Sequence, residues 1–406
     1  MPVSSKQSPL ASKIASAPKP HDNSNPLWKG PCAPGPLGGI TQSMLVRFMS
    51  CRERFRLKYV LGLEPPDKWS KPLGYGNMWH VCEEALASER AHFGEAVGTT
   101  LWEDNLRKHT AKQFAKYPFQ REEIEKWFRV CTVQFPEYTK HWSKHPDVVG
   151  REPLMQEGVF DVQYVLPSGR VVRLRGKFDS VDLIDGGIYL QENKTKGDID
   201  KEDVERQLKF DLQTMLYLIA LQSVQHDKAT DTPGDVLSKW GSDIRGVRYN
   251  VVRRPLSGGI GNITPHKGKC TKPVYSKRKG QEHVVLHESK VTPAETADEF
   301  YERLRRDYLA ADPEYWFFRV RSEVSAADVE LFRNTCLDPL LEQLCSWYDE
   351  VTGQPRGVIN PPLNYRTPFG VWSALEEGGA TEYDAYLATG SEAGLHRVET
   401  LFGELQ

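Results

Sequence analysis

The order of strand-like and helix-like segments after Pro153 constrains the fold more than any other feature of this sequence. Three stretches rich in β-branched and aromatic residues, 159–165, 171–184 and 188–194, are separated by the turn-forming sequences Pro167-Ser168-Gly169 and Asp185-Gly186-Gly187. A helical pattern over 201–222 and a further strand over 246–253 follow. This order predicts an antiparallel three-stranded meander that continues into a mixed α/β layer.

Helical patterns flank this region on both sides. Apolar residues recur at helical spacing before the meander. Tryptophans lie in a charged, periodic region between these helical patterns and the meander. The first 36 residues are rich in Pro, Ser and Lys, so we expect a disordered tail there. The predicted division is a tail over 1–36, a main domain over 37–325 with a helical insertion at 94–150, and a helical C-terminal segment over 326–406.

The charge of the 406-residue chain is −2, which by itself gives no reason to expect a polyanionic partner. One segment differs from the average, because residues 244–281 contain no Asp or Glu. Such a segment suits a phosphate backbone, although a solvated basic loop is the alternative. Its ten cationic residues are Arg245, Arg248, Arg253, Arg254, Lys267, Lys269, Lys272, Lys277, Arg278 and Lys279.

Targeting and redox features are sparse. No uncharged apolar run approaches the roughly 18 residues of a membrane span, and the first residues lack the apolar block of a signal peptide. We therefore expect a cytoplasmic protein that does not enter membranes. The seven cysteines form no CxxC pair, which favours reduced thiols over a disulfide framework or a zinc site.

The Asp185-Gly186 turn fixes the register of the last two strands of the meander. A two-residue type I′ turn would pair Ile184 with Gly187, and the same register would then place Asp179 opposite Glu192. Two carboxylates at that distance repel each other unless a cation or a proton lies between them. Lys194 lies two residues beyond Glu192 and therefore on the same face of the strand.

An Asp, a Glu and a Lys on one face can support metal-assisted phosphodiester hydrolysis. Carboxylates bind Mg²⁺ or Mn²⁺, and a lysine orients water or neutralises developing charge. A surface hairpin with an ordinary Glu192–Lys194 ion pair is the alternative, because this short pattern often arises by chance. Two further pairs lie at helical spacing: His80 with Glu84, and Gln213 with Tyr217.

Together these motifs resemble the RecB-like branch of the PD-(D/E)XK nuclease superfamily. The resemblance rests on Gly76 and His80 in one helix, on Gly176-Lys177-Phe178-Asp179, on Glu192-Asn193-Lys194 and on the segment from Gln213 to Tyr217. The opening segment from Ser43 to Leu63 is similar to the start of such domains. The resemblance covers about residues 41–221, and it implies a PD-(D/E)XK (restriction-endonuclease-like) α/β mixed-sheet core with a helical elaboration.

The resemblance also implies roles for individual residues. His80, Asp179, Glu192 and the backbone carbonyl of Asn193 would bind Mg²⁺ or Mn²⁺, with Asp179, Glu192 and Lys194 as the catalytic set. Because imidazole suits Mn²⁺ better than Mg²⁺, Mn²⁺ should support activity at least as well. Gln213 and Tyr217 would contact DNA or brace the metal-binding strands, and the other residues expected to contact DNA are Lys177, Lys196, Arg253 and Arg254. For His80 a buried core histidine is the alternative, and for Gln213 and Tyr217 it is helix packing.

The expected function is a metal-dependent deoxyribonuclease, with exonuclease action as the expectation, in DNA repair, recombination or phage DNA metabolism. Some RecB-like nucleases hold an iron–sulfur cluster, but no cysteine follows Cys345, so no cluster is expected. The chain has no phosphate loop of the GxxxxGK[ST] type, so a helicase or recombination partner would be a separate protein. The alternatives are a non-catalytic DNA-binding module on the same fold and a structural or interaction protein.

Overall fold

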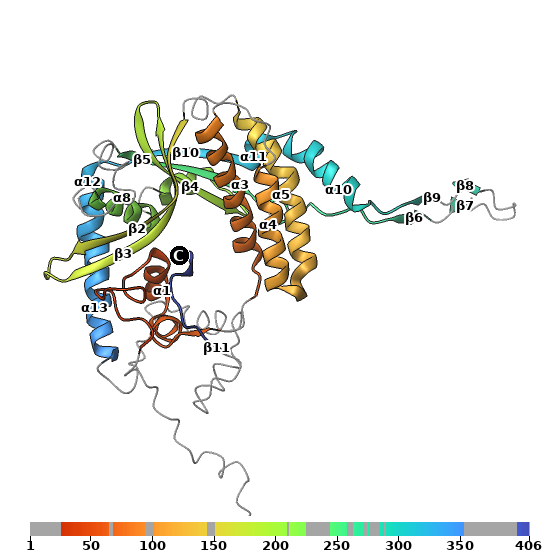
Figure 1. Cartoon of the computed structure of the whole chain (residues 1–406). Helices are drawn as coiled ribbons and strands as arrows, with labels where there is room; N and C mark the ends of the chain where they lie inside the picture. Colours follow the sequence, from red (N-terminus) through yellow and green to blue (C-terminus); the bar gives the residue numbers. More distant parts are fainter. Residues whose placement is uncertain are drawn as a thin grey trace, which may run out of the picture.

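A five-stranded mixed sheet lies at the centre of the chain (Figure 1). In this computed structural model the described residues are 26–64, 68–93, 101–143, 151–208, 211–224, 244–257, 263–271, 274–275, 285–287, 290–352 and 396–405. The strand order is β10-β5-β4-β3-β2. The strands are β2 (Arg151–Val165), β3 (Val171–Ile184), β4 (Gly187–Lys196), β5 (Ile244–Arg253) and β10 (Phe317–Glu323).

Pairing within the sheet confirms the predicted mixed α/β class. Strands β2, β3 and β4 form the expected antiparallel meander, whereas β4 and β5 run parallel. A parallel pair requires a crossover connection. Part of that connection is helical: α7 (Lys201–Leu208) and α8 (Leu212–Val224) come between the two strands. A single helix was expected here, but Asp211 lies outside the helix and accepts a hydrogen bond from the Thr214 N–H, so a new helix begins.

The turn between β3 and β4 has the predicted geometry. Asp185 and Gly186 have φ angles of 52° and 73°, and positive φ at both central residues defines a type I′ turn. The ladder then runs in the predicted register from Ile184–Gly187 to Ser180–Gln191. Backbone pairing of the two strands ends there, one position before Asp179 and Glu192.

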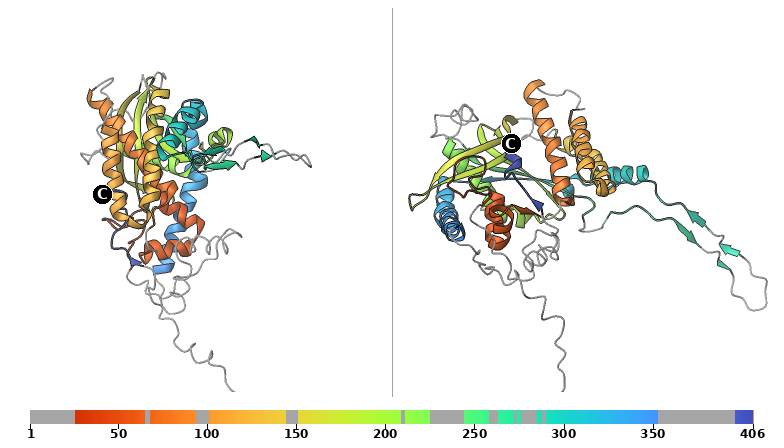
Figure 2. Two further views of the ribbon diagram at one scale, coloured as in Figure 1. Left: turned by 90° about the vertical axis from the view of Figure 1, so that its right-hand side faces the viewer. Right: turned by 60° about the horizontal axis from the view of Figure 1, so that its bottom comes forward.

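Helices cover the sheet on both faces. Helices α3 (Lys71–Phe93), α4 (Leu101–Lys116) and α5 (Arg121–Trp142) pack side by side and form one layer (Figures 1 and 2). Strand β5 shows how the two faces alternate. Its residues Val247, Tyr249 and Val251 belong to the hydrophobic core with α8, and Val252 belongs to the core with α3 to α5.

The N-terminal and C-terminal parts of the domain join in the core with α8. Helix α1 (Gln42–Ser50), the short α2 (Arg52–Phe55) and a π-helical turn (Arg56–Val60) lie beside α12 (Ala326–Phe332) and α13 (Asp338–Thr352). Another π-helical turn, Arg333–Leu337, links α12 to α13. Strand β11 (His396–Arg397) pairs with β1 (Leu63–Glu64), and Leu401 and Phe402 are buried next to it.

The disordered tail expected over residues 1–36 includes eleven residues, 26–36, that the structure describes as ordered. The Trp28 side chain is fully buried, its indole N–H donates to the Gly39 carbonyl at 2.7 Å, and its ring packs on Phe55. Such a large apolar side chain stabilises an ordered N-terminal segment despite the polar composition around it. Residues 1–25 lie outside the described residues.

A narrow two-stranded ribbon extends away from the body of the molecule (Figures 1 and 2). It consists of β6 (Lys269–Thr271) paired with β9 (Lys290–Thr292), and β7 (Val274–Tyr275) paired with β8 (Val285–His287). The ribbon joins the body near α10 (Ala297–Arg303), which a π-helical turn (Leu304–Leu309) and α11 (Pro313–Trp316) follow. It carries part of the basic segment; Lys272 and Lys277 to Lys279 lie outside the described residues. In the described part of the chain, no helix is long and apolar enough to cross a membrane.

Candidate active site

A cavity of about 360 Å³ opens where β3 and β4 separate. Strands β3 and β4, helices α1, α3 and α8, and the C-terminal Leu405 supply its walls. The residues predicted from sequence that line it are His80, Lys177, Asp179, Glu192, Asn193, Lys194, Gln213 and Tyr217. Segments far apart in the sequence therefore bring most of the predicted site together.

Beyond the last backbone pair of β3 and β4, the Asp179 side chain connects the two strands. Its Oδ2 accepts a hydrogen bond from the backbone N–H of Asn193 at 2.7 Å. This contact anchors the carboxylate against β4 and leaves Oδ1 directed toward α3, where the Nδ1 of His80 lies 3.4 Å away. The Asn250 side chain fixes Asn193 from the opposite face of the sheet by donating to its Oδ1 at 2.9 Å.

Glu192, Lys194 and Gln213 form a compact hydrogen-bonded group. The Lys194 Nζ donates to Glu192 Oε1 at 2.5 Å and to Gln213 Oε1 at 2.6 Å, and Gln213 Nε2 donates to Glu192 Oε1 at 2.7 Å. The same amide lies 3.2 Å from the Tyr217 hydroxyl. Glu192 is 1% exposed, yet its second oxygen, Oε2, has no hydrogen-bond partner among the described residues.

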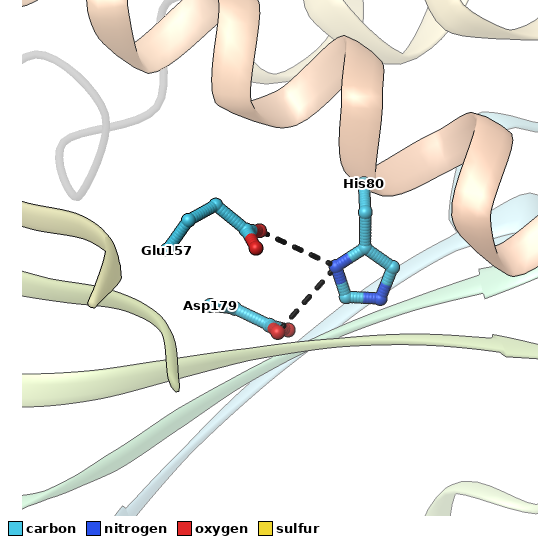
Figure 3. A group of neighbouring side chains, drawn as sticks. All are labelled: His80, Glu157 and Asp179. Atoms are coloured by element: carbon cyan, nitrogen blue, oxygen red, sulfur yellow. Dashed lines mark ion pairs between the residues drawn. The ribbon is translucent and has the colours of Figure 1, made fainter. Parts of the chain in front are cut away.

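Glu157 is a site residue that the sequence analysis missed. Figure 3 shows its carboxylate and that of Asp179 directed toward the His80 ring, with Glu157 Oε1 4.0 Å from His80 Nδ1. Its backbone has a φ of 49°, in the left-handed region, although it lies within β2. The adjacent Gly158 was the available sequence cue, since a glycine inside a strand pattern often indicates a bulge.

Burial shifts the protonation equilibria of the acidic groups. Desolvation raises the pKa of Asp179 to about 7, and the hydrogen bond from Asn193 opposes that shift. Desolvation and then the charge of Asp179 raise the pKa of Glu192 to about 7. Burial lowers the pKa of His80. For Lys194, burial alone would lower the pKa, but the carboxylates of Glu192, Asp179 and Asp211 together outweigh it and the net pKa is raised.

These features fit a divalent cation. Two buried carboxylates with raised pKa values are costly to ionise unless positive charge compensates them. Lys194 supplies one such charge, but Glu192 Oε2 remains a buried acceptor without a partner in the part of the chain that the structure describes. Carboxylate oxygens, a backbone carbonyl and an imidazole are ligands that Mg²⁺ and, more readily, Mn²⁺ accept.

Three predicted DNA-contacting residues lie outside this cavity. The Arg253 side chain is 7% exposed, forms an ion pair with Asp198 at 2.5 Å and stacks on the Tyr315 ring. Arg254 donates to the Thr195 carbonyl at 2.6 Å. These contacts give both arginines a structural role, and a contact of either residue or of Lys196 with DNA stays a prediction.

Comparison with known proteins agrees with the geometry. The family model described as the PD-(D/E)XK nuclease superfamily matches residues 40–327, which is more than half of the chain. No curated protein shows a significant match. The matched range contains the five sheet strands and every predicted site residue.

Proposed function

Because the chain belongs to the PD-(D/E)XK nuclease superfamily, we propose that it is a metal-dependent deoxyribonuclease of the RecB-like branch that hydrolyses phosphodiester bonds. One observation carries the proposal: Asp179, Glu192 and Lys194 meet in a single cavity, with a buried oxygen of Glu192 unpartnered among the described residues. Binding a polyanion without catalysis would not require acidic groups in the cavity that receives it.

The proposed metal ligands are Asp179, Glu192, the backbone carbonyl of Asn193 and His80. A bound Mg²⁺ or Mn²⁺ supplies a Lewis acid that polarises a phosphoryl oxygen and makes water more acidic. Lys194 lies within hydrogen-bonding distance of Glu192, so its ammonium group can orient the attacking water and stabilise developing negative charge. Gln213 holds Lys194 and Glu192 in this arrangement.

The finer parts of the proposal concern substrate and context. We propose DNA as the substrate, exonuclease action, and a role in repair, recombination or phage DNA metabolism, with any helicase or recombination partner supplied by another protein. The nitrogen ligand His80 leads us to expect that Mn²⁺ supports cleavage at least as well as Mg²⁺. Activity abolished by Mn²⁺ would contradict this ligand set.

The test is degradation of labelled linear and circular DNA with Mg²⁺, Mn²⁺ or EDTA. Lys194→Ala and Asp179→Ala should each lower the cleavage rate by at least about 100-fold. Lys108→Ala, at an exposed position on α4, is the matched control and should retain the rate. Cleavage of linear DNA without cleavage of circular DNA supports exonuclease action. DNA binding without cleavage in either metal would replace the nuclease proposal with a DNA-binding module.

A further inference from the structure

The segment before α1 carries an exposed cysteine on a tight turn. Cys32 follows Pro31 in the turn from Gly30 to Ala33, in which the Ala33 N–H donates to the Gly30 carbonyl at 3.4 Å. Proline at the second position of such a turn limits its backbone conformations. The Pro31 carbonyl accepts from the Arg173 N–H at 2.9 Å, so β3 also holds the turn. Cys32 therefore has a defined place on the surface.

Helix α13 brings a second cysteine to this turn. The Tyr348 ring packs on Trp28 with 4.9 Å between the ring centroids, and its hydroxyl donates to the Trp28 carbonyl at 2.9 Å. A Cβ at Gly30 would lie 2.6 Å from the same ring, so the segment runs directly against the helix. Cys345 precedes Tyr348 by three residues and therefore lies on the same face of α13. The thiols of Cys345 and Cys32 share a hydrogen bond.

The two thiols differ in their access to solvent. Cys32 is exposed, whereas Cys345 is 2% exposed. Burial and then the neighbouring Cys32 raise the pKa of Cys345 to about 12, and a hydrogen bond with Arg170 opposes that shift. Because the thiolate and not the thiol attacks a disulfide, Cys32 is the group that meets an oxidant, and Cys345 reacts after it.

Another pair of neighbouring thiols lacks this access. The Sγ atoms of Cys82 and Cys131 lie 3.9 Å apart, between α3 and α5. Both residues are fully buried in the hydrophobic core of that helical layer. An oxidant in solvent does not reach them, so exposure distinguishes the pair at Cys32 from the pair at Cys82.

We propose that Cys32 and Cys345 form a reversible disulfide when the chain meets a small disulfide oxidant such as glutathione disulfide. Cys32 loses its proton to solvent, its thiolate attacks one sulfur of the oxidant, and one glutathione leaves as a thiolate. Cys345 then loses its proton and attacks the Cys32 sulfur, and the second glutathione leaves. The two protein thiols lose two electrons, and one glutathione disulfide becomes two glutathione thiols.

This bond would join the segment that leads into α1 to the helix that follows the sheet. It closes a loop that contains all five strands of the sheet, and closing a long loop reduces the conformational entropy of the unfolded chain. The oxidised chain should therefore unfold at a higher temperature than the reduced chain. This inference does not depend on the proposed nuclease activity.

The experiment is incubation of the purified full chain with glutathione disulfide, followed by peptide mapping by mass spectrometry without reduction. The wild-type chain should give a peptide that joins Cys32 to Cys345 and a melting temperature higher by about 5 °C, which dithiothreitol reverses. Cys345→Ser should instead accumulate glutathione on Cys32, because no thiol displaces it. Cys336→Ser, at a half-buried position on the π-helical turn before α13, is the matched control and should form the bond.

Two outcomes in the wild-type chain would overturn the proposal. Glutathione that stays on Cys32 would show that Cys345 does not reach it. A Cys32 that does not react, or that bonds to a different cysteine, would rule out this pair. Cys32→Ser, at an exposed position, keeps the test decisive if Cys345→Ser does not fold, because it should lose both the linked peptide and the rise in melting temperature.

Discussion

At the scale of single residues, Gln213 connects the acidic and basic groups of the site. Its amide oxygen accepts from Lys194, and its amide nitrogen donates to Glu192, so one side chain fixes the orientation of both. Tyr217, one helical turn later, stands beside the amide, and its ring packs against Phe160 and Phe178. The aromatic packing orients the helix, and the amide transmits that orientation to the site.

Gln213→Ala should therefore slow DNA cleavage at saturating Mn²⁺ by about 10–100-fold, because Lys194 loses a positioning partner. The measurement is the single-turnover cleavage rate, together with Mn²⁺ affinity. The matched control is Gln222→Ala on the same helix, a residue that does not line the cavity. An unchanged rate in Gln213→Ala would mean that Glu192 alone positions Lys194.

At the scale of elements, buried polar contacts tie the sheet together away from the site. The Asp182 carboxylate on β3 is fully buried and lies 2.8 Å from Arg151 Nε and 3.3 Å from Arg248 Nη2. Strands β2, β3 and β5 each contribute one of these charges. On the same sheet, the Asn250 amide nitrogen, which also donates to Asn193, donates to the Tyr138 hydroxyl at 2.7 Å and lies 3.2 Å from Glu83 Oε1, which docks α5 and α3 on β5.

Asp182→Asn should lower the free energy of unfolding by about 3–5 kcal/mol, because it removes the buried carboxylate that both guanidinium groups face. Urea denaturation measures this change. Asp185→Asn, three residues later, is the control: its carboxylate is 60% exposed and pairs with Arg321 at the surface. That variant should stay within about 0.5 kcal/mol of the wild type. Equal effects of the two substitutions would show that the buried charges do not determine stability here.

At the scale of the whole molecule, the β-ribbon and the cavity differ in electrostatic character. The cavity concentrates carboxylates, whereas the base of the ribbon presents the exposed Lys267 and Lys269, within a segment that has no acidic residue. A polyanion that reaches an acidic cavity needs cationic contacts outside it to hold it there. The ribbon can supply such contacts.

Replacing both Lys267 and Lys269 by Gln should weaken DNA binding by roughly tenfold at low salt. The slope of the logarithm of DNA affinity against the logarithm of salt concentration should become shallower by an amount that corresponds to about two phosphate contacts. The cleavage rate at saturating DNA should stay unchanged, because neither lysine lines the cavity. Fluorescence anisotropy over a salt series measures the slope. A Lys108→Gln and Lys112→Gln pair on α4 tests for a mere loss of net charge; an equal decrease in that variant would remove the case for the ribbon.

The sequence predicted those features that depend only on interactions between residues close together in the chain. The Asp185-Gly186 turn set the register of β3 and β4, and residue periodicity predicted the meander and a helix after it, which the structure divides into α7 and α8. Helical spacing of Gln213 and Tyr217 likewise predicted one shared face. These features depend on backbone conformations that neighbouring residues dictate by themselves.

The tertiary structure decided what depends on packing between distant segments. Glu157 enters the site because β2 distorts beside β3, and Trp28 is ordered because its ring finds Phe55 and Tyr348. Arg253 contacts Asp198 and Tyr315, partners that its place in the sequence does not reveal, and its contact with DNA stays a prediction. The type of a residue indicates which interactions it can make, but its partners are set by elements brought together only when the chain folds.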